Sequence, residues 1–180
     1  MSEIILGLKL SESSRAGTVV GVKLSGGVEW ALHCCVVLTA SAEPVPAARL
    51  AQLHDVSSTY LAKQLQALSR AGLVHSVQGK SGGYVLTRRP EEITLLDVVE
   101  AIDGQQSTFV CTEIRQRGPL ATPAEACSAP CPIARAMYTA DQAWRDALRA
   151  VSIADLRGTV IADSGGGDAF GPIAEWLRAV

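Results

Sequence analysis

Several features that would place this chain of 180 residues in other protein classes are missing. No apolar run reaches the roughly 18 residues that a membrane-spanning helix needs. The first ten residues, MSEIILGLKL, lack the basic start and the small-residue cleavage site of a secretion signal, so a cytoplasmic protein is expected. Charged residues make up only 19%, but apolar residues make up 48%, which indicates a globular chain and not a disordered one.

The common signatures of enzymes are also missing. The sequence contains no Gly-x-Ser-x-Gly, no P-loop, no dinucleotide fingerprint after a strand and no His-Glu-x-x-His. The segment GKSGGY at residues 79–84 contains the Gly-Lys-Ser of a phosphate loop, but it lacks the preceding strand and the spacing. We therefore expect a protein that is not an enzyme.

The charge is unevenly distributed along the chain. A net charge of −2 is a weak argument against a nucleic-acid partner, yet residues 44–90 contain six basic side chains and one acidic side chain, Asp55. The six are Arg49, Lys63, Arg70, Lys80, Arg88 and Arg89. A basic segment in an acidic protein is typical of a phosphate-binding surface, and chance clustering on a solvated face is the alternative.

This basic segment begins with a predicted helix-turn-helix. Pro44 and Pro46 precede a short helix, AARLAQLHDV, and a longer helix follows in SSTYLAKQLQALSRAGLV. Ser57 or Ser58 can cap the longer helix, leucines repeat at helical spacing, and Gly72 ends it. The residues expected to contact DNA from its first turns are Ser58, Thr59, Tyr60 and Lys63. His54 and His75 are expected to be surface or backbone-bonding residues.

A β-hairpin follows in HSVQGKSGGYVLTRR, with GKSGG as its turn. Glycine lets such a tip approach a sugar–phosphate backbone, and Lys80, Arg88 and Arg89 supply positive charge. The expected fold is mainly α with a small β-hairpin wing. It consists of a winged helix-turn-helix over residues 23–104, after a flexible extension over residues 1–22.

Two further helices suggest a dimer. The helix expected over residues 24–39 is apolar on nearly its whole circumference, as in helices buried between two bodies. The helix expected over residues 132–151 has a continuous apolar stripe, which includes Met137, Ala140, Trp144 and Leu148. A dimerisation element over residues 132–160 is the simplest interpretation, and packing on its own domain is the alternative. Residues 161–180 are expected to be a linker and a tail.

Residues 105–131 form an irregular segment that contains Cys111, Cys127 and Cys131. In a reducing compartment, loop cysteines indicate a metal or cluster site more often than disulfides, although a redox thiol pair and incidental cysteines remain open. Cys34 and Cys35 lie in the middle of a helix and point about 100° apart. They are expected to act as small hydrophobic core residues.

Glu29 and His33 lie one turn apart in VEWALHCC, facing away from the apolar stripe of their helix. One interpretation is a hydrogen bond between them at the surface. The other is that both present ligand atoms to one metal, as Glu-x-x-His pairs do in helical di-iron sites. The spacing leaves both open.

Several motifs together resemble a known family. These are KLS at residues 23–25, SRAGLVHSVQGKSGGYVLTR, ITLLDVVEAIDG, the cysteine loop and CPIARAM. Over about residues 22–160 they resemble the winged-helix iron–sulfur transcription regulator family that includes IscR and NsrR. The resemblance implies a homodimer that binds double-stranded operator DNA as a repressor and holds a 2Fe–2S cluster near its dimer interface.

The loop cysteines are more widely spaced than in most members of that family, because sixteen positions separate Cys111 from Cys127. VEWALHCC and CTEIRQRGPLATP resemble the redox-sensing members, in which two cysteines of one subunit and a Glu and a His of the other hold the cluster. That resemblance implies Cys111 and Cys131 as ligands together with Glu29 and His33 of the partner subunit. Cys127 is the reserve ligand.

Trp30 follows Glu29 directly and is placed to sense a change at such a cluster, although a core aromatic needs no special role. Two other functions remain open. One is a winged-helix regulator that depends on zinc or on a Cys127–Cys131 disulfide, without an iron–sulfur cluster. The other is an interaction module that kept the fold and lost the sensor.

Overall fold

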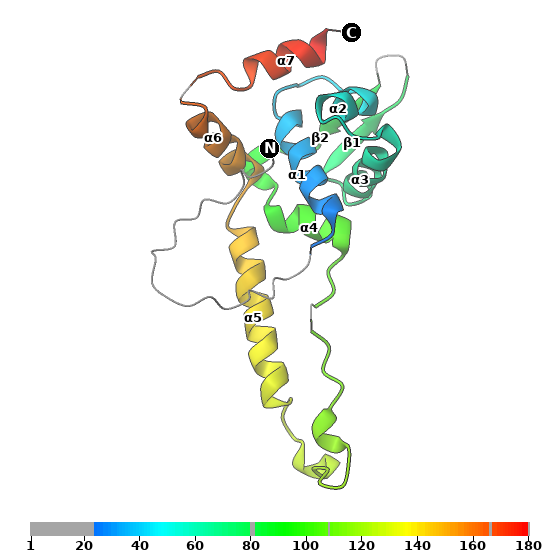
Figure 1. The fold of residues 1–180 in the computed structure, drawn as a ribbon, viewed down its shortest axis with the longest axis vertical. Helices are drawn as coiled ribbons and strands as arrows, with labels where there is room; N and C mark the ends of the chain where they lie inside the picture. The colour runs from blue at the N-terminus through cyan, green and yellow to red at the C-terminus, as the bar shows by residue number, and fades with distance from the viewer. Residues whose placement is uncertain (1–23, 80–81, 108, 166, 180) are drawn as a thin grey trace.

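The computed structural model describes residues 24–79, 82–107, 109–165 and 167–179 (Figure 1). The expected N-terminal extension and Lys80 therefore lie outside the described residues. Figure 1 shows a helical domain that includes a small hairpin. A long arm extends downward from this domain. The arm, residues 105–149, consists of the irregular segment that follows α4 and of helix α5, and we call it the cysteine arm.

The helical domain contains a helix-turn-helix followed by a wing. Its elements are α1 (Gly26–Leu38), α2 (Ala47–Leu53), α3 (Ser58–Arg70), β1 (Val74–Val77), β2 (Gly83–Leu86), η1 (Pro90–Glu92) and α4 (Leu95–Asp103). The elements that follow are η2 (Ile114–Gln116), η3 (Ala124–Ala126), α5 (Pro132–Arg149), α6 (Ile153–Asp163) and α7 (Gly171–Arg178). The predicted fold class, mainly α with a small hairpin wing, is confirmed. Among the described residues, no helix is both long and apolar enough to cross a membrane.

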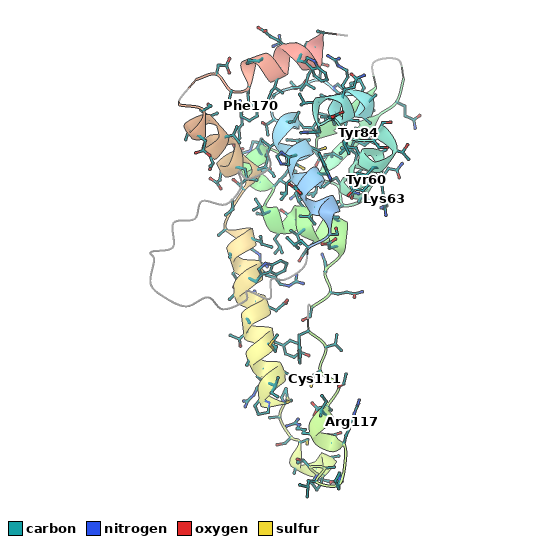
Figure 2. All side chains as sticks on the ribbon, viewed as in Figure 1. Tyr60, Lys63, Tyr84, Cys111, Arg117 and Phe170 are labelled. Carbon is teal, nitrogen blue, oxygen red and sulfur yellow. The ribbon has the colours of Figure 1, made fainter. Side chains whose placement is uncertain are left out.

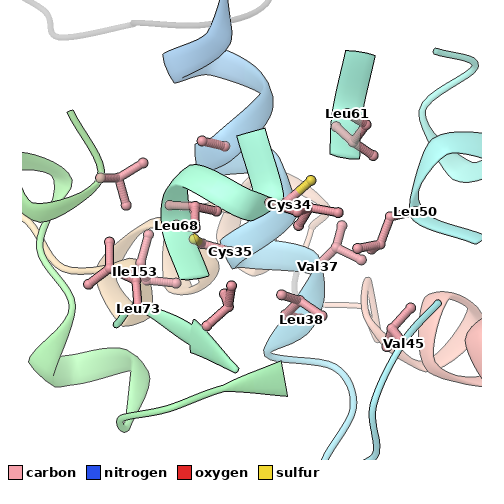
Figure 3. Close-up of a cluster of buried hydrophobic side chains, with 14 of the residues drawn as sticks. Cys34, Cys35, Val37, Leu38, Val45, Leu50, Leu61, Leu68, Leu73 and Ile153 are labelled. Carbon is pink, nitrogen blue, oxygen red and sulfur yellow. The ribbon is translucent and has the colours of Figure 1, made fainter. Parts of the chain in front are cut away.

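The core forms where α1 packs against α3, α4 and α6 (Figure 3). Helix α1 contributes Ala31, Cys34 and Cys35, all fully buried, and this confirms that both cysteines are core residues. Burial raises the pKa of the Cys34 thiol to about 12, and it raises that of Cys35 further. These thiols therefore stay protonated at neutral pH, in which form they are poor metal ligands.

The wing is a two-stranded antiparallel hairpin in which Val74 pairs with Leu86 and Val77 with Gly83. A bridge between Val45 and Tyr84 attaches the hairpin to the chain just before α2. The bridge needs glycine at position 83, because a Cβ there would lie 2.3 Å from the backbone carbon of Val45. Gly83 therefore lets the hairpin approach the protein's own backbone, which is a different use of glycine from the predicted approach of the wing tip to a sugar–phosphate backbone.

Two capping boxes lie side by side where α4 and α6 begin. The side chain of Thr94 caps α4 with Asp97, and that of Ser152 caps α6 with Asp155. Backbone bridging of Thr94 to Ser152 joins the two helix starts. The arm helix α5 ends just before this junction, so its base is held against the helical domain.

The last helix, α7, lies within residues 161–180, for which the sequence suggested a linker and a tail. Its Leu177 is buried and belongs to the core cluster, and Ile173 and Trp176 pack against that cluster. Helix α7 is therefore part of the folded domain.

Candidate cluster site and nucleic-acid interface

Helix α3 presents a polar face to solvent and an apolar face to the core. Its inward positions Leu61, Leu65 and Leu68 are fully buried, as their spacing predicts. The four side chains predicted to contact DNA, Ser58, Thr59, Tyr60 and Lys63, are all exposed. Figure 2 labels Tyr60 and Lys63 close together on the outer side of α3. A contiguous polar surface with one lysine is thus available on this helix.

The turn between α2 and α3 is tight and depends on Asp55. This residue has a positive φ of 49°, and the next amide, Val56 N–H, donates back to the Ala51 carbonyl at 3.0 Å. Asp tolerates this left-handed conformation better than most residues. The turn sets the angle between α2 and α3, and hence the direction in which the exposed face of α3 points.

The basic residues of the wing differ in their surroundings. Arg89 forms an exposed ion pair with Glu92, with Nη2 2.8 Å from Oε1, and the hydrogen bond to Glu92 raises the pKa of Arg89. The Arg88 guanidinium is exposed, and within the described residues it donates to the Glu92 backbone carbonyl at 3.4 Å but forms no ion pair. The positive charge of Arg88 is therefore less compensated than that of Arg89.

At the far end of the cysteine arm, Glu113 connects the segments that carry Cys111 and Cys131. The Cys111 thiol lies 3.7 Å from Glu113 Oε1, and the backbone N–H of Cys131 is among the groups that lower the pKa of Glu113. Arg115 holds Glu113 in place, with Nε 2.7 Å from Oε2, and this contact lowers the pKa of Glu113. The first and the last cysteine of the arm are thereby brought to one carboxylate.

Arg115 closes the loop and brings positive charge close to the cysteines. Its Nη2 donates to the Ala129 carbonyl at 2.6 Å, across fourteen residues of chain. Cys127 and Cys131 both act electrostatically on this guanidinium. All three arm cysteines are half-buried, unlike the core pair.

Cys131 has the most favourable surroundings for a thiolate. It is the N-cap residue of α5, although its side chain makes no capping hydrogen bond. The nearby backbone N–H groups of Ala134 and Ile133 lower the pKa of Cys131, and the charge of Arg115 lowers it further. Two half-buried sulfurs, one of them at a helix N-terminus, are suitable donors for a metal centre.

Glu29 and His33 are exposed on α1, which Figure 1 shows in the helical domain, apart from the far end of the cysteine arm. Within the described part of the chain, no hydrogen bond joins the two side chains. The ring of His33 lies 5.6 Å from that of His54, centroid to centroid, and Trp30 lies 6.0 Å from His54. Burial, and then the charge of His33, lower the pKa of His54.

One chain therefore does not bring all the expected ligands together. Among the described residues, no group of three or more His, Cys, Asp or Glu side chains is arranged to hold a metal ion. The structure groups Cys111 and Cys131, with Cys127 near the same arginine, and it leaves Glu29 and His33 apart from them. The arm cysteines fit half of a cluster's ligand set, and a complete set needs residues from elsewhere.

The profile of the Rrf2 family, described as iron-dependent transcriptional regulators, matches residues 24–158, which contain the winged helix and the cysteine arm. The chain belongs to the Rrf2 family. This confirms the resemblance seen in the sequence. Because the family consists of transcriptional regulators, the expectation that the protein is not an enzyme is also confirmed.

Curated relatives of this Rrf2-family chain are also transcription regulators by name. It is 37% identical over 92 residues to the putative HTH-type transcriptional regulator YwgB of Bacillus subtilis, covering 49% of this chain and 58% of that protein. It is 38% identical over 76 residues to the HTH-type transcriptional regulator IscR of Aliivibrio salmonicida, covering 42% and 45%. The matches thus span about half the length of these relatives.

Solved structures show the same architecture. CymR of B. subtilis, titled the global cysteine regulator, superposes on this Rrf2-family chain with a TM-score of 0.59 at 25% identity, covering 77% of this chain and 98% of CymR. IscR of T. potens superposes with a TM-score of 0.55 at 20% identity, covering 80% and 89%, and this likeness concerns the fold alone.

Sequence reasoning missed Glu113 and Arg115 in this Rrf2-family chain. Both lie in CTEIR, where a carboxylate follows Cys111 by two positions and a guanidinium by four. An acidic and a basic residue so close to a loop cysteine are a local signal that could have indicated an ion pair beside Cys111. The pairing with Ala129 and Cys131 is long-range, so only the structure brings it out.

Proposed function

We propose that this protein is a homodimeric transcription regulator, a repressor, whose binding to operator DNA is controlled by the redox state or the presence of a 2Fe–2S cluster. The observation that carries the proposal is the grouping of Cys111 and Cys131 around Glu113 at the end of a projecting arm. The arm brings these two sulfur donors to one carboxylate, and Cys127, the reserve ligand, lies near the same arginine. Such a half-site suits a centre that two chains complete.

The DNA-binding part of the proposal rests on the exposed face of α3 and on the wing. Side chains at the start of a recognition helix reach base edges and phosphates, and a hairpin wing contacts the backbone beside it. Ser58, Thr59, Tyr60 and Lys63 are placed for the first function. Arg88, Arg89 and Lys80 are assigned to the second, with Arg88 preferred over the paired Arg89.

The dimer is supported by the apolar face of α5. Ile133, Met137 and Tyr138 are large side chains that stay exposed in a single chain, and the only buried residue of α5 is Ala134. An amphipathic helix of eighteen residues with so little cover gains free energy when its apolar stripe is buried. A second copy of the helix provides a matching stripe.

In the proposed dimer, Cys111 and Cys131 of one chain and Glu29 and His33 of the other hold the cluster, with Cys127 as reserve. Glu29 and His33 are exposed and lack hydrogen-bond partners within the described residues, so they are accessible to a second chain. A bound 2Fe–2S cluster supplies a one-electron couple, and histidine ligation raises its potential. Glu113 and Arg115 hold the two cysteines in position before the partner arrives.

The route from the ligand helix to the DNA-binding helix passes through His54. This residue is the C-cap of α2, at the turn that leads to α3, and its ring touches both His33 and Trp30 edge-on. A movement of His33 or Trp30 would therefore displace His54 at the turn between α2 and α3. This supports Trp30 as a residue that reports the cluster's state to the DNA-binding surface.

A thiol or zinc switch is the second candidate. The specific observation in its favour is that Arg115 lies near both Cys127 and Cys131, where positive charge favours thiolates. One structural relative, CymR of B. subtilis, is named the global cysteine regulator. A Cys127–Cys131 disulfide would form with loss of two electrons and two protons to an oxidant.

The visible absorption and circular dichroism spectrum of anaerobically purified protein separates the two candidates. Charge-transfer bands that bleach on dithionite reduction and return on air oxidation support the cluster. Cys111→Ser and Cys131→Ser should abolish these bands, and Cys127→Ser is the matched control that should keep them. Colourless protein from iron-replete anaerobic cells, containing bound zinc or a disulfide, would reject the cluster in favour of the second candidate.

A further inference from the structure

Helix α7 lies outside the residues that match the Rrf2 family, which end at 158. The function proposed above makes no use of it. Figure 1 shows α7 extending from the end of α6 across the domain to α2, the first helix of the helix-turn-helix. Leu177 is buried in the core cluster, so the docked position of α7 is well defined.

Two arginines hold the α7 segment at its two ends. Arg157 of α6 lies over the ring of Phe170, with its guanidinium carbon 4.9 Å from the ring centroid. Arg49 of α2 lies over the ring of Trp176 at 3.6 Å. Both are cation–π contacts, and they join α7 to α6 on one side and to α2 on the other.

Arg49 also caps the C-terminal end of α7. Its Nη2 donates to the Ala179 carbonyl at 3.1 Å and to the Trp176 carbonyl. The last carbonyls of a helix have no partners within the helix and carry partial negative charge. One cation of the basic segment is therefore occupied by the chain's own C-terminal helix.

The hold on α7 is incomplete. The Nε atoms of Arg49 and Arg157 are buried without hydrogen-bond partners in the described structure. A buried donor without a partner disfavours the docked state relative to one in which water or an anion meets it. A helix of eight residues is also too short to persist alone in water, so α7 unfolds when it leaves. Docking of α7 is thus poised to be reversible.

Arg49 lies on the helix that, in helix-turn-helix proteins, crosses the phosphate backbone of DNA. A guanidinium binds a phosphate through two parallel hydrogen bonds, and a phosphate carries more negative charge than helix carbonyls do. We propose that α7 and a DNA phosphate compete for Arg49. Helix α7 is then an autoinhibitory clasp, and its release adds one backbone contact per subunit. This inference rests on the proposed DNA-binding function.

Deleting residues 171–180 tests the clasp, and the deletion removes one acid, Glu175, and one base, Arg178, so the formal net charge is unchanged. The truncated chain should bind a mixed-sequence duplex more tightly at low salt. Its log affinity should fall more steeply with log salt, by about 0.9 per subunit. Arg49→Ala in the truncated chain should return the slope to that of the full chain.

Arg178→Ala in the full chain is the matched control. Among the described residues, its Nε donates to the Ala174 carbonyl of its own helix, so the change removes a charge without releasing α7. The slope should not increase. Equal salt slopes for the full and truncated chains would overturn the clasp, whereas failure of both chains to bind any duplex would overturn the proposed function itself.

A second measurement does not depend on the truncation. In full-length protein labelled with 5-fluorotryptophan, Trp176→Phe assigns the ¹⁹F resonance of Trp176. Saturating duplex should move this resonance to the position of a solvent-exposed tryptophan, because Arg49 leaves the ring. A resonance that stays at its docked position in the saturated complex would show that DNA and α7 do not compete.

Discussion

The guanidinium of Arg145 in α5 meets the carboxylate of Glu100 in α4, with Nη1 2.6 Å from Oε1. The same guanidinium pairs with Asp141 at 3.0 Å and donates to the backbone carbonyls of Gln105 and Gln106. One side chain therefore joins α4, the start of the cysteine arm and α5. It fixes the direction in which the arm leaves the helical domain.

Arg145→Ala should lower the free energy of unfolding by about 2 kcal/mol, between the values for exposed and for buried ion pairs, because Glu100 and Asp141 both lose their ion pair with Arg145 in partly buried surroundings. Urea unfolding followed by circular dichroism measures this. Arg149→Ala is the control, because its pair with Asp146 is exposed and should contribute less than about 1 kcal/mol. Equal effects of the two changes on the free energy of unfolding would mean that Arg145 does not hold the arm to the helical domain.

Iodoacetamide should label three of the five thiols in the native, cluster-free protein. Cys34 and Cys35 are fully buried and protonated, whereas Cys111, Cys127 and Cys131 are half-buried. Because its pKa is lowered, Cys131 should keep its labelling rate best as the pH falls below the ordinary cysteine value of about 8.5. Mass spectrometry of peptides at several pH values gives each rate. Labelling of Cys34 in the native protein would contradict its burial in the core.

Lys63→Ala should weaken binding to all duplex sequences and reduce the magnitude of the salt slope by about 0.9 per subunit, since each lost phosphate contact retains one counterion. Lys80→Ala is expected to act in the same way from the wing. Arg89→Ala should change the slope less, because Glu92 already compensates its charge. Fluorescence anisotropy across a salt series measures all three, and an unchanged slope for Lys63→Ala removes this residue from the interface.

Met137→Asp should convert the dimer to monomer. Met137 lies on the apolar stripe of α5 and is 41% exposed in one chain, so a carboxylate there disrupts the dimer without disrupting the domain. Burying an unpaired charge should raise the dimer dissociation constant by about 100-fold or more. Sedimentation velocity is the measurement. The control is Thr139→Asp, on the same helix but off the apolar stripe. A dimer that survives Met137→Asp would mean that α5 is not the interface.

Mixing two defective subunits tests whether the cluster site is shared. Cys131→Ala and His33→Ala homodimers should each hold little or altered cluster. A heterodimer of the two should regain one intact site, because one chain contributes both sulfurs and the other contributes Glu29 and His33. Cluster absorbance per heterodimer after reconstitution gives the count. No recovery, with wild-type subunits loading normally, would place all ligands in one chain.

The winged helix could be predicted because its signals are local. The leucine spacing of α3 shows in the sequence, and glycines mark the helix ends. Gly72, just after α3, and Gly104, the C-cap of α4, adopt positive φ values of 71° and 86°. Such conformations favour glycine on steric grounds, so the residue type alone indicates the helix end.

The remaining features depend on contacts between residues far apart in sequence. Helix α7 follows the glycine-rich SGGGDAFG and has eight residues, too few for a periodic pattern, and its partner Arg49 is 130 positions from Ala179. Likewise, nothing local pairs Arg115 with Ala129 or places Trp30 against His54. Tertiary packing determines these contacts, and single-sequence patterns do not encode it.

The apolar side chains displayed on the arm also bear on the lifetime of a newly made chain. Leu120 is 94% exposed and Ile133 67% exposed in a single chain. Chaperones and proteases engage exposed apolar surface of this kind. In the proposed dimer, a chain that pairs quickly buries its arm helix, and a chain made in excess stays open to degradation.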